Sequence, residues 1–405
     1  MIRIQQLKVP LNYDEALLRK EIARKLKIQA SDIKELRVRK QSLDARKKPD
    51  LYYVLTVDFC LAKEQQVLKK KQQVTISQVT DSPYQMPESG SEALPHRPVI
   101  AGFGPAGLFC ALLLARAGYR PLILERGADV DHRTTAVEQF WKNGILDTES
   151  NIQFGEGGAG TFSDGKLNTL VKDACGRNHY VLKTFVEAGA DPDILYVNKP
   201  HIGTDVLRNV VKHIRQEILS LGGEVRFGCK VTDLKIKDQQ LVGVCVNHTE
   251  EIPCEALVLA IGHSARDTFA MLHEHQILMQ PKSFAVGLRI EHPQSMINLS
   301  QYGQEHHPLL GSANYKVTRK LANGRGVYSF CMCPGGYVVN ASSEEGRLAV
   351  NGMSYRARDS RNANSAMIVT VTPDDFGHAG VLGGIEFQRD LEKAAWQAGN
   401  GKVPV

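Results

Sequence analysis

A group of three glycines with a fixed spacing carries the clearest chemical signal in the sequence. The segment Arg97-Pro-Val-Ile-Ala-Gly-Phe-Gly-Pro-Ala-Gly107 joins an apolar strand to a helix predicted over Leu108–Ala117. Gly102 permits a tight turn, Gly104 lets a pyrophosphate approach the backbone, and Gly107 allows close helix-strand packing. Unpaired N–H groups and the helix dipole at the start of that helix favour negative charge. The spacing predicts a phosphate-binding turn that consists of Gly102, Gly104, Pro105, Ala106 and Gly107.

An acidic residue follows at the distance that such a turn requires. A second apolar strand begins at Pro121 and ends at Glu125, 23 residues after Gly102. A carboxylate at this place accepts hydrogen bonds from a ribose diol and disfavours a 2'-phosphate. Because strand, helix and terminal acid come in order, the pattern indicates a dinucleotide site rather than an ordinary tight turn.

A second glycine-rich segment, Phe154–Lys166, has five glycines in thirteen residues. Bare backbone at Gly158 and Gly160 can lie against a flat ring, and Ser163 and Lys166 can donate to ring or phosphate oxygens. The alternative is a surface loop that needs positive φ angles. No strand precedes the segment and no strand with a terminal acid follows it, so we expect no separate nicotinamide-binding domain.

Two cysteines and a histidine are the candidates for chemistry. In a strand over Tyr328–Cys333, the period of two places Cys331 and Cys333 on one face, where they could act as a redox pair or as a thiolate nucleophile. Their Cα separation is near the upper limit for a disulfide, so buried packing cysteines remain the alternative. His263 is a possible proton donor, although scattered histidines are often structural. No Cys/His cluster has zinc spacing, so we expect no metal site.

Three segments resemble glutathione-reductase-like flavoproteins. Glu125-Arg126-Gly127 resembles the end of their second strand, and Gly223–Val231 resembles the strand whose backbone at Val231 meets adenine. Ala256–Asp267 is similar to their second flavin-domain signature, in which Gly262, His263 and Ser264 stand beside the cofactor. The resemblance implies FAD rather than NAD in the site, with Arg126 among the residues that contact it.

A longer likeness runs over essentially the whole chain. Phe284–Pro293, Tyr328–Gly336 and Asn351–Arg358 resemble a family known as FAD-dependent dehydrogenases or FAD-dependent proteins. The resemblance implies a glutathione-reductase-like oxidoreductase with non-covalent FAD, a small-molecule substrate, and NAD(P)H or an electron-transfer protein as possible partners. The family supplies no agreed substrate.

The order of elements predicts how these residues are positioned. Residues 1–80 predict the order β-α-β-β-α-β of a ferredoxin-like α+β domain, with a capping box of Asn12 and Glu15 at its first helix. Residues 81–98, rich in proline and serine, form a linker. We predict an α/β fold in which a Rossmann-like FAD-binding domain at 99–270 is followed by an inserted β-rich substrate domain at 271–405. The expected N-terminal elements are strand Ile2–Val9, helix Tyr13–Leu26, strands Leu36–Ser42 and Leu51–Cys60, helix Ala62–Lys71 and strand Val74–Val79.

Composition excludes several classes of protein. Among 405 residues, 42% are apolar and 23% are charged, as in ordinary globular chains and unlike disordered, collagenous or disulfide-stapled ones. The eight cysteines are too sparse for a disulfide framework. The longest apolar run, Leu108–Ala115, has eight residues, whereas a bilayer span needs roughly 20. No secretion signal is present at the N-terminus, so we expect a cytoplasmic protein with no membrane span.

The charge is unevenly distributed along the chain. Residues 1–80 hold 18 Lys and Arg against 9 Asp and Glu, a net charge of +9, and the remainder has a net charge of −3. Basic clusters attract polyanions by counterion release, but they also occur on ordinary solvated surfaces. An RNA-associated flavoprotein is therefore the less favoured alternative, beside a non-catalytic flavin-binding protein. The densest clusters are Arg37–Lys40, Arg46–Lys48 and Lys69–Lys71.

The C-terminal stretch lacks a feature that the resemblance implies. Flavoproteins of this class close the FAD domain with a late strand, a phosphate turn and a helix. Gly383 and Gly384 precede a helix predicted over Asp390–Ala398, but no apolar strand leads into them, and 399–405 is typical of a connecting loop. We expect a truncated chain with weak flavin retention; a variant closure through Gly383 and Gly384 is the alternative.

Overall fold

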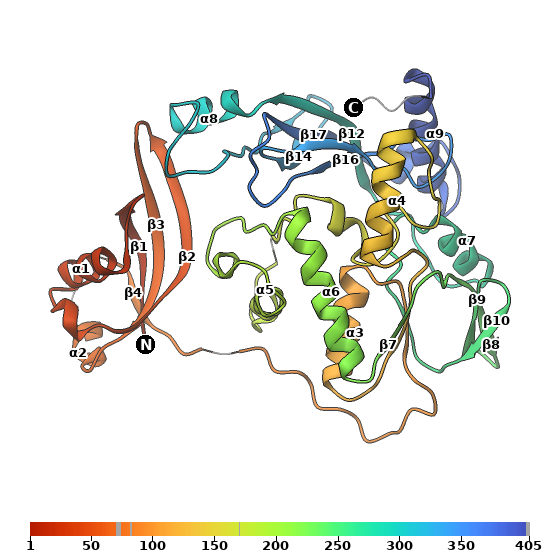
Figure 1. Ribbon diagram of the computed structural model, residues 1–405, viewed down its shortest axis with the longest axis horizontal. Coiled ribbons are helices and arrows are strands. Elements are labelled where there is room, and N and C mark those ends of the chain that lie inside the picture. Colours follow the sequence, from red (N-terminus) through yellow and green to blue (C-terminus); the bar gives the residue numbers. More distant parts are fainter. Residues whose placement is uncertain (70–73, 82, 170, 402–405) are drawn as a thin grey trace. The chain divides into compact units, whose positions relative to one another are not determined.

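The computed structural model describes residues 1–69, 74–81, 83–169 and 171–401. The chain forms two units, and each unit is built from three separate segments. Unit 1 comprises 1–87, 166–202 and 293–315, and unit 2 comprises 88–165, 203–292 and 316–405. The fold is mixed α/β with parallel and antiparallel sheets (Figure 1). The units therefore interleave along the chain, whereas the sequence predicted contiguous ranges.

Unit 1 is built on an antiparallel sheet with strand order β2-β3-β1-β4. Apolar side chains of the sheet and of α1 form its core, including Ile4, Leu18, Ile22 and Phe59. The order of elements is the predicted β-α-β-β-α-β; the part of the second predicted helix at Lys70–Lys71 lies outside the described residues. The bounds are β1 Ile2–Pro10, α1 Glu15–Leu26, β2 Lys34–Lys47, β3 Asp50–Cys60, α2 Glu64–Lys69 and β4 Ile76–Gln78, followed later in the chain by α5 Arg177–Glu187 and α8 Gln294–Tyr302.

The N-cap of the first helix lies two residues after the position that the sequence predicted. The Leu17 N–H donates to Asp14 Oδ1 at 2.7 Å, so Asp14 is the N-cap and the capping box predicted at Asn12 is wrong. Asn and Asp side chains can both accept hydrogen bonds from the free N–H groups of a first turn. Asp14 is the N-cap because its backbone is extended and it directly precedes the helix.

A buried carboxylate organises the basic residues of this sheet. Asp58 is fully buried and accepts hydrogen bonds from Arg3 at 2.7 and 2.8 Å and from Arg39 at 2.7 Å. Burial alone would raise the pKa of Asp58, but the two guanidinium groups outweigh burial and hold it below the usual value. Arg39 and Arg37 also pair with Asp81. Three of the basic residues of this region, Arg3, Arg37 and Arg39, are thus paired with carboxylates within the unit.

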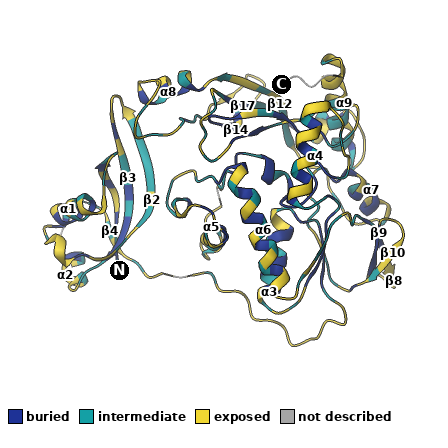
Figure 2. Ribbon diagram, viewed as in Figure 1, coloured by how far each residue is buried: buried dark blue, intermediate teal, exposed yellow. Residues whose placement is uncertain are grey.

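Unit 2 contains a parallel sheet with strand order β11-β5-β6-β7. Its strands are short, and the central two are fully buried, as expected where helices cover both faces. On α6, the buried residues recur every three or four positions, so one face packs inward and the other is exposed (Figure 2). The bounds are β5 Val99–Ala101, α3 Pro105–Arg116, β6 Leu122–Leu124, α4 Val130–Asn143, α6 Thr204–Ser220, β7 Glu224–Arg226, β11 Leu257–Leu259 and α7 Arg266–Glu274.

Two further sheets and a small two-stranded one complete unit 2. The strand order is β10-β9-β8 in one sheet and β12-β17-β14-β13 in the other, while β15 pairs with β16. Helix α9 begins at Gly383, seven residues before the predicted start at Asp390. The bounds are β8 Val231–Lys237, β9 Gln240–Val246, β10 Glu250–Pro253, β12 Phe284–Pro293, β13 Thr318–Lys320, β14 Gly326–Cys333, β15 Tyr337–Asn340, β16 Val350–Met353, β17 Asn362–Val371 and α9 Gly383–Ala398.

Strand β14 departs from the predicted alternation. Its register with β17 shifts between Phe330 and Cys333, and Cys331 has a φ of 48°. Met332 and Cys333 are both buried and Cys331 is half-buried, so the prediction that Cys331 and Cys333 share one face by simple period-two alternation is wrong. A bulge adds a residue to one strand and breaks the period of two at that point.

Within the described part of the chain, no helix has both the length and the apolar character needed to cross a bilayer.

Candidate functional site

A cavity of about 1090 Å³ opens in unit 2 at the carboxyl ends of β5, β6 and β11. In parallel α/β sheets, ligands bind outside the carboxyl ends of the strands, where the strand order reverses. The volume is slightly above the usual range for ligand pockets, about 300–1,000 Å³. Predicted residues that line the cavity are Gly102, Gly104, Pro105, Ala106, Glu125, Arg126, Gly158, Gly160, Val231, Gly262, His263 and Ser264.

The three glycines of the first turn have different physical reasons to be glycine. A Cβ on Gly102, whose φ is +100°, would stand 2.5 Å from the Ala260 carbonyl oxygen, and a Cβ on Gly107 would stand 2.0 Å from the Gly102 oxygen. Gly104 has a φ of −72°, and its Cβ would meet only Gly158 Cα, at 3.7 Å. The protein itself therefore has room for a side chain at Gly104. The free space lies at the N-terminus of α3 and inside the cavity, where a phosphate group fits.

Glu125 joins three loops around the cavity. Its Oε2 accepts from Phe103 N–H at 2.7 Å, and its Oε1 accepts from Gly127 and Gly155 N–H at 2.9 Å each. The side chain is only 4% exposed and still lines the cavity. A carboxylate has about four acceptor sites, so three bonds leave one for a ligand. Glu125 can therefore hold a ribose hydroxyl while it fixes the surrounding backbone.

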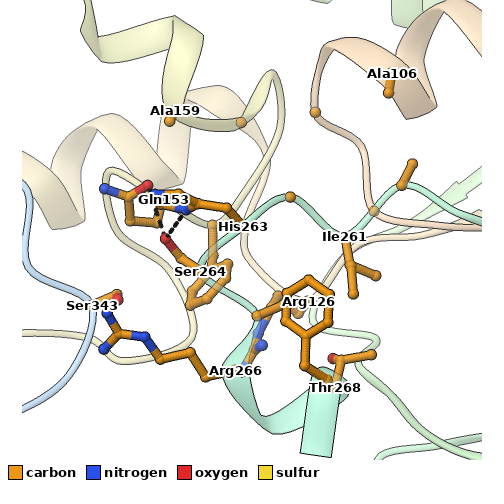
Figure 3. Close-up of a pocket in the computed structure, with 18 of the residues that line it drawn as sticks. Ala106, Arg126, Gln153, Ala159, Ile261, His263, Ser264, Arg266, Thr268 and Ser343 are labelled. Atoms are coloured by element: carbon orange, nitrogen blue, oxygen red, sulfur yellow. Dashed lines mark hydrogen bonds between the residues drawn. The ribbon is translucent and has the colours of Figure 1, made fainter. Parts of the chain in front are cut away.

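Arg126 forms a rigid platform in the cavity wall (Figure 3). Its guanidinium stands 4.1 Å from the centre of the Phe154 ring and donates to Asp267 at 2.8 and 2.9 Å and to Glu149 at 2.9 Å. Lys230 completes the cluster through Glu149 at 2.8 Å. Two cations thus face two carboxylates, and the planar guanidinium can stack on an aromatic base without adding net charge.

The second glycine-rich segment contributes only part of what the sequence predicted. Gly158 and Gly160 line the cavity, and Gly157 N–H donates to the Phe103 carbonyl at 2.9 Å. Ser163 instead bonds within its own loop, donating to Gly160 O at 2.7 Å and accepting from Gly165 N–H at 3.0 Å. Lys166 pairs with His201 as a β-bridge in unit 1. Among the described residues, the cavity lining does not include Ser163, Lys166 or Gly107.

His263 lies in the cavity with a defined hydrogen-bond chain (Figure 3). Its Nδ1 is 2.7 Å from the Ser264 hydroxyl, whose Oγ is 3.3 Å from Gln153 Oε1. If that hydroxyl donates to Gln153, a neutral imidazole carries its proton on Nδ1 and Nε2 is an acceptor; if it donates to Nδ1, the other tautomer results. Desolvation by the surrounding protein, followed by the charge of Arg266, lowers the pKa of His263 below its usual 6.5. The imidazole is therefore neutral at pH 7.

An ion network, which the sequence did not predict, borders the same part of the cavity. Arg266, at the first turn of α7, is 7% exposed and donates to Glu392 at 2.6 and 3.0 Å and to Glu344 at 3.0 Å. Gln388 of α9 accepts from the same guanidinium at 3.1 Å. Because Arg266, Gln388 and Glu392 all line the cavity, α9 forms part of its wall. The lining also includes Gln153, Ser343 and Asn351.

Neither candidate cysteine is among the residues that line the cavity. Cys333 is fully buried, and its thiol donates to the Cys331 carbonyl at 3.3 Å. Arg289 donates to the same carbonyl at 3.2 Å and also bonds Asn364. The two cysteines thus belong to the packing of the β14 bulge. No group of three or more His, Cys, Asp or Glu with metal-binding geometry occurs in the described segments.

One comparison with known proteins names a cofactor for the C-terminal part of the chain. Residues 283–405 match a family model described as FAD-dependent protein, C-terminal domain-like, and residues 1–60 match a domain of unknown function, DUF8436. A protein of Clostridium beijerinckii, described as uncharacterized, is 51% identical over 408 residues, which cover 100% of this chain and 76% of that protein.

Solved structures show only distant likeness. THI4 of Thermovibrio ammonificans is 17% identical over 45% of this chain and 65% of its own, with a TM-score of 0.28. The halogenase PltM is 12% identical over 73% of this chain and 55% of its own, with a TM-score of 0.34. The chain thus spans less than two thirds of either structure, and scores this low carry no argument.

Proposed function

The chain belongs to the family of FAD-dependent proteins, with FAD as its cofactor, and on that premise we propose that it is an oxidoreductase acting on a small molecule. The observation that carries the proposal is the space above Gly104, which the protein has no steric reason to leave open. It lies at a helix N-terminus, in a cavity whose walls also offer an acceptor for ribose and a stacking platform. These features support binding of a dinucleotide in an extended form.

We assign the parts of the cavity by the chemistry of their walls. Glu125, Arg126 and Val231 fit the adenosine half, and the first turn of α3 fits the pyrophosphate. Gly158, Gly160 and the Gly262–Ser264 turn then remain for the flavin half, together with residues of α9 and of the β15–β16 region. Bound FAD would accept a hydride or an electron pair, and the protein orients the substrate beside it.

His263 is our candidate for the proton acceptor in that reaction. In the tautomer with the proton on Nδ1, its neutral imidazole presents Nε2 while Nδ1 is fixed by Ser264 and Gln153. A base with a pKa near or below neutrality can take a proton from a substrate amine, hydroxyl or activated carbon. Cys331 is half-buried and Cys333 is buried, and neither lines the cavity, so we assign them no catalytic role.

The test is anaerobic reduction of the FAD-loaded chain by a panel of metabolites that includes amines, hydroxy acids, NADH and NADPH. We expect at least one to bleach the visible flavin band rapidly, with a saturable dependence on its concentration. A flavin that dithionite reduces readily but that no class of metabolite reduces would argue for a non-catalytic flavin-binding protein.

A further inference from the structure

The stretch from Ser150 to Gly157, which runs into the second glycine-rich segment, is largely buried although it has no regular secondary structure. Asn151, Ile152 and all of Phe154–Gly158 are buried. Buried backbone carbonyls need hydrogen-bond partners. Within this stretch, Asn151 N–H donates to Phe154 O at 3.2 Å and Gly158 N–H donates to Gly155 O at 2.9 Å. The carbonyls of Asn151, Ile152 and Glu156 need donors from elsewhere.

Arg133 on α4 supplies those hydrogen bonds. The side chain is fully buried, with its Nε donating to Asn151 O at 2.8 Å and its Nη2 to Ile152 O at 2.7 Å. Nη1 donates to Glu156 O at 2.6 Å and to Gly155 O at 3.3 Å. One planar guanidinium thus binds four carbonyls of a six-residue stretch, which a single ammonium group could not do.

The charge of Arg133 persists in spite of its burial. Desolvation lowers the pKa of Arg133 to about 10, while the nearby carboxylates of Glu125 and Glu156 act in the opposite direction. The guanidinium therefore remains protonated at neutral pH, and all of its N–H donors remain available. It also stacks over the Phe162 ring, with 4.9 Å between the guanidinium carbon and the ring centre.

The opposite side of the same loop faces the cavity. Gln153, Phe154 and Gly155 line it, and Gly155 N–H donates to Glu125. A Cβ on Gly155 would stand 2.5 Å from Arg133 Cδ, so the guanidinium stem and the loop are in close contact. Any shift of the guanidinium would move Gly155, and with it both the cavity wall and one hydrogen bond of Glu125.

We propose that Arg133 is a positioning residue that holds loop 151–156 in the shape that FAD requires, although it lies behind the cavity wall. This inference rests on the assignment of the cavity to FAD. It differs from a general stabilising role because it predicts loss of FAD affinity under conditions in which the chain is still folded.

The experiment compares Arg133→Lys, Arg133→Ala and the matched control Arg208→Met with the wild type. Arg208 also stacks on the Phe162 ring, at 5.1 Å, but makes none of the four carbonyl contacts. For each protein we would measure FAD affinity by fluorescence quenching, folding by circular dichroism, and hydrogen exchange of residues 151–158 without FAD. Arg133→Ala is also titrated with FAD in the presence of guanidinium ion at non-denaturing concentration.

Arg133→Lys keeps the charge and the length of the side chain, so we expect a folded protein whose FAD dissociation constant rises at least about tenfold. Faster exchange of loop 151–158 should accompany that loss, and guanidinium should restore FAD affinity to Arg133→Ala but leave Arg208→Met unchanged. The proposal is overturned if Arg133→Lys binds FAD like the wild type, or if Arg208→Met loses as much affinity. A wild type that binds no FAD would instead overturn the assignment of the cavity.

Discussion

Glu125 and Arg133, two charged side chains at the cavity, form hydrogen bonds with backbone groups of the protein itself. Glu125 accepts from three N–H groups and Arg133 donates to four carbonyls, so the two side chains satisfy loops that have no ladder partners. A buried ionic group that makes several short hydrogen bonds costs much to remove, because its partners are then left unsatisfied. At this scale, our proposal makes stability and cofactor binding depend on the same atoms.

Glu125→Gln tests this dual role. The amide would present N–H groups where the carboxylate accepts from backbone N–H, so we expect a free energy of unfolding lower by about 1–3 kcal/mol together with weaker FAD binding. Denaturant unfolding without FAD and an FAD titration measure the two effects separately. Loss of FAD affinity with unchanged stability would contradict the backbone role, and loss of stability with full FAD affinity would contradict the ribose role.

His263 should show its role in the pH dependence of flavin reduction. A base must be deprotonated to act, and the pKa of His263 is lowered below 6.5, so the rate with a reducing substrate should reach a plateau at alkaline pH and fall along an acidic limb whose midpoint lies below pH 6.5. In His263→Gln the rate should drop by about 10²–10⁴ and lose that acidic limb. Stopped-flow absorbance over a pH series measures both. An unchanged acidic limb in the variant would assign the titration to another group.

At the scale of elements, α9 is tied to the cavity through ions rather than through a strand. Arg266 on α7 binds Glu392 on α9 and Glu344, and Arg389 on α9 binds Glu344 at 2.8 Å. Burial alone would raise the pKa of Glu344, but Arg389, Arg266 and Arg347 outweigh it and lower that pKa. The stabilisation by this carboxylate is therefore present above its unfolded pKa, about 4.3, and is lost as the pH falls through the lowered value.

Glu344→Gln should reduce the free energy of unfolding by about 1–3 kcal/mol at pH 7. It should also make unfolding less sensitive to acid below about pH 4.3, because the variant no longer titrates there. Glu386→Gln is the matched control, since Glu386 binds the same Arg389 from an exposed position. Thermal unfolding followed by circular dichroism over a pH series measures both variants. Equal effects of the two substitutions would mean that the ion pairs of Glu344 with Arg266 and Arg389 contribute no more to the free energy of unfolding than the exposed ion pair of Glu386.

The bulge in β14 decides the reactivity of the cysteines. Cys175 is exposed, whereas Cys333 is fully buried and bonded to the Cys331 carbonyl. An alkylating reagent should therefore modify Cys175 rapidly in the folded protein and leave Cys333 unmodified until the chain unfolds. Peptide mass mapping after timed quenching follows each thiol. Modification of Cys333 as fast as Cys175 would show an open thiol and revive a chemical role for it.

For the whole molecule, local patterns predicted the elements and the glycine turn that lines the cavity, but not the contacts between distant segments. The Gly102–Gly107 turn and Glu125 belong to strands and a helix that follow one another in the sequence, so the spacing of these residues can be recognised as a motif. The carbonyl ligands of Arg133 lie 18–23 residues further along in a loop without a repeating pattern, and the partners of Arg266 lie 78–126 residues away. In the sequence, nothing in the spacing or type of the neighbouring residues distinguishes Arg133 and Arg266 from arginines on the surface.

The interleaving of the units and the bulge escaped prediction for similar reasons. Unit 1 takes up 166–202 and 293–315 through tertiary packing that no composition shift marks. The insertion in β14 depends on its register with β17, 30 or more residues further along the chain. The basic N-terminal segment was visible from the sequence, but its pairing with Asp58 and Asp81 required the folded sheet.

The most direct test of the account is the FAD affinity of Gly104→Val. Backbone conformation and neighbouring atoms both permit a side chain at Gly104, so the variant should fold like the wild type while its side chain fills the space above α3 that the pyrophosphate needs. We expect the wild type and the control Gly326→Val, whose added Cβ has no neighbour within 4 Å, to bind one equivalent of FAD. Gly104→Val should bind FAD at least about tenfold more weakly. Wild-type affinity in a folded Gly104→Val protein would contradict the placement of FAD in this cavity.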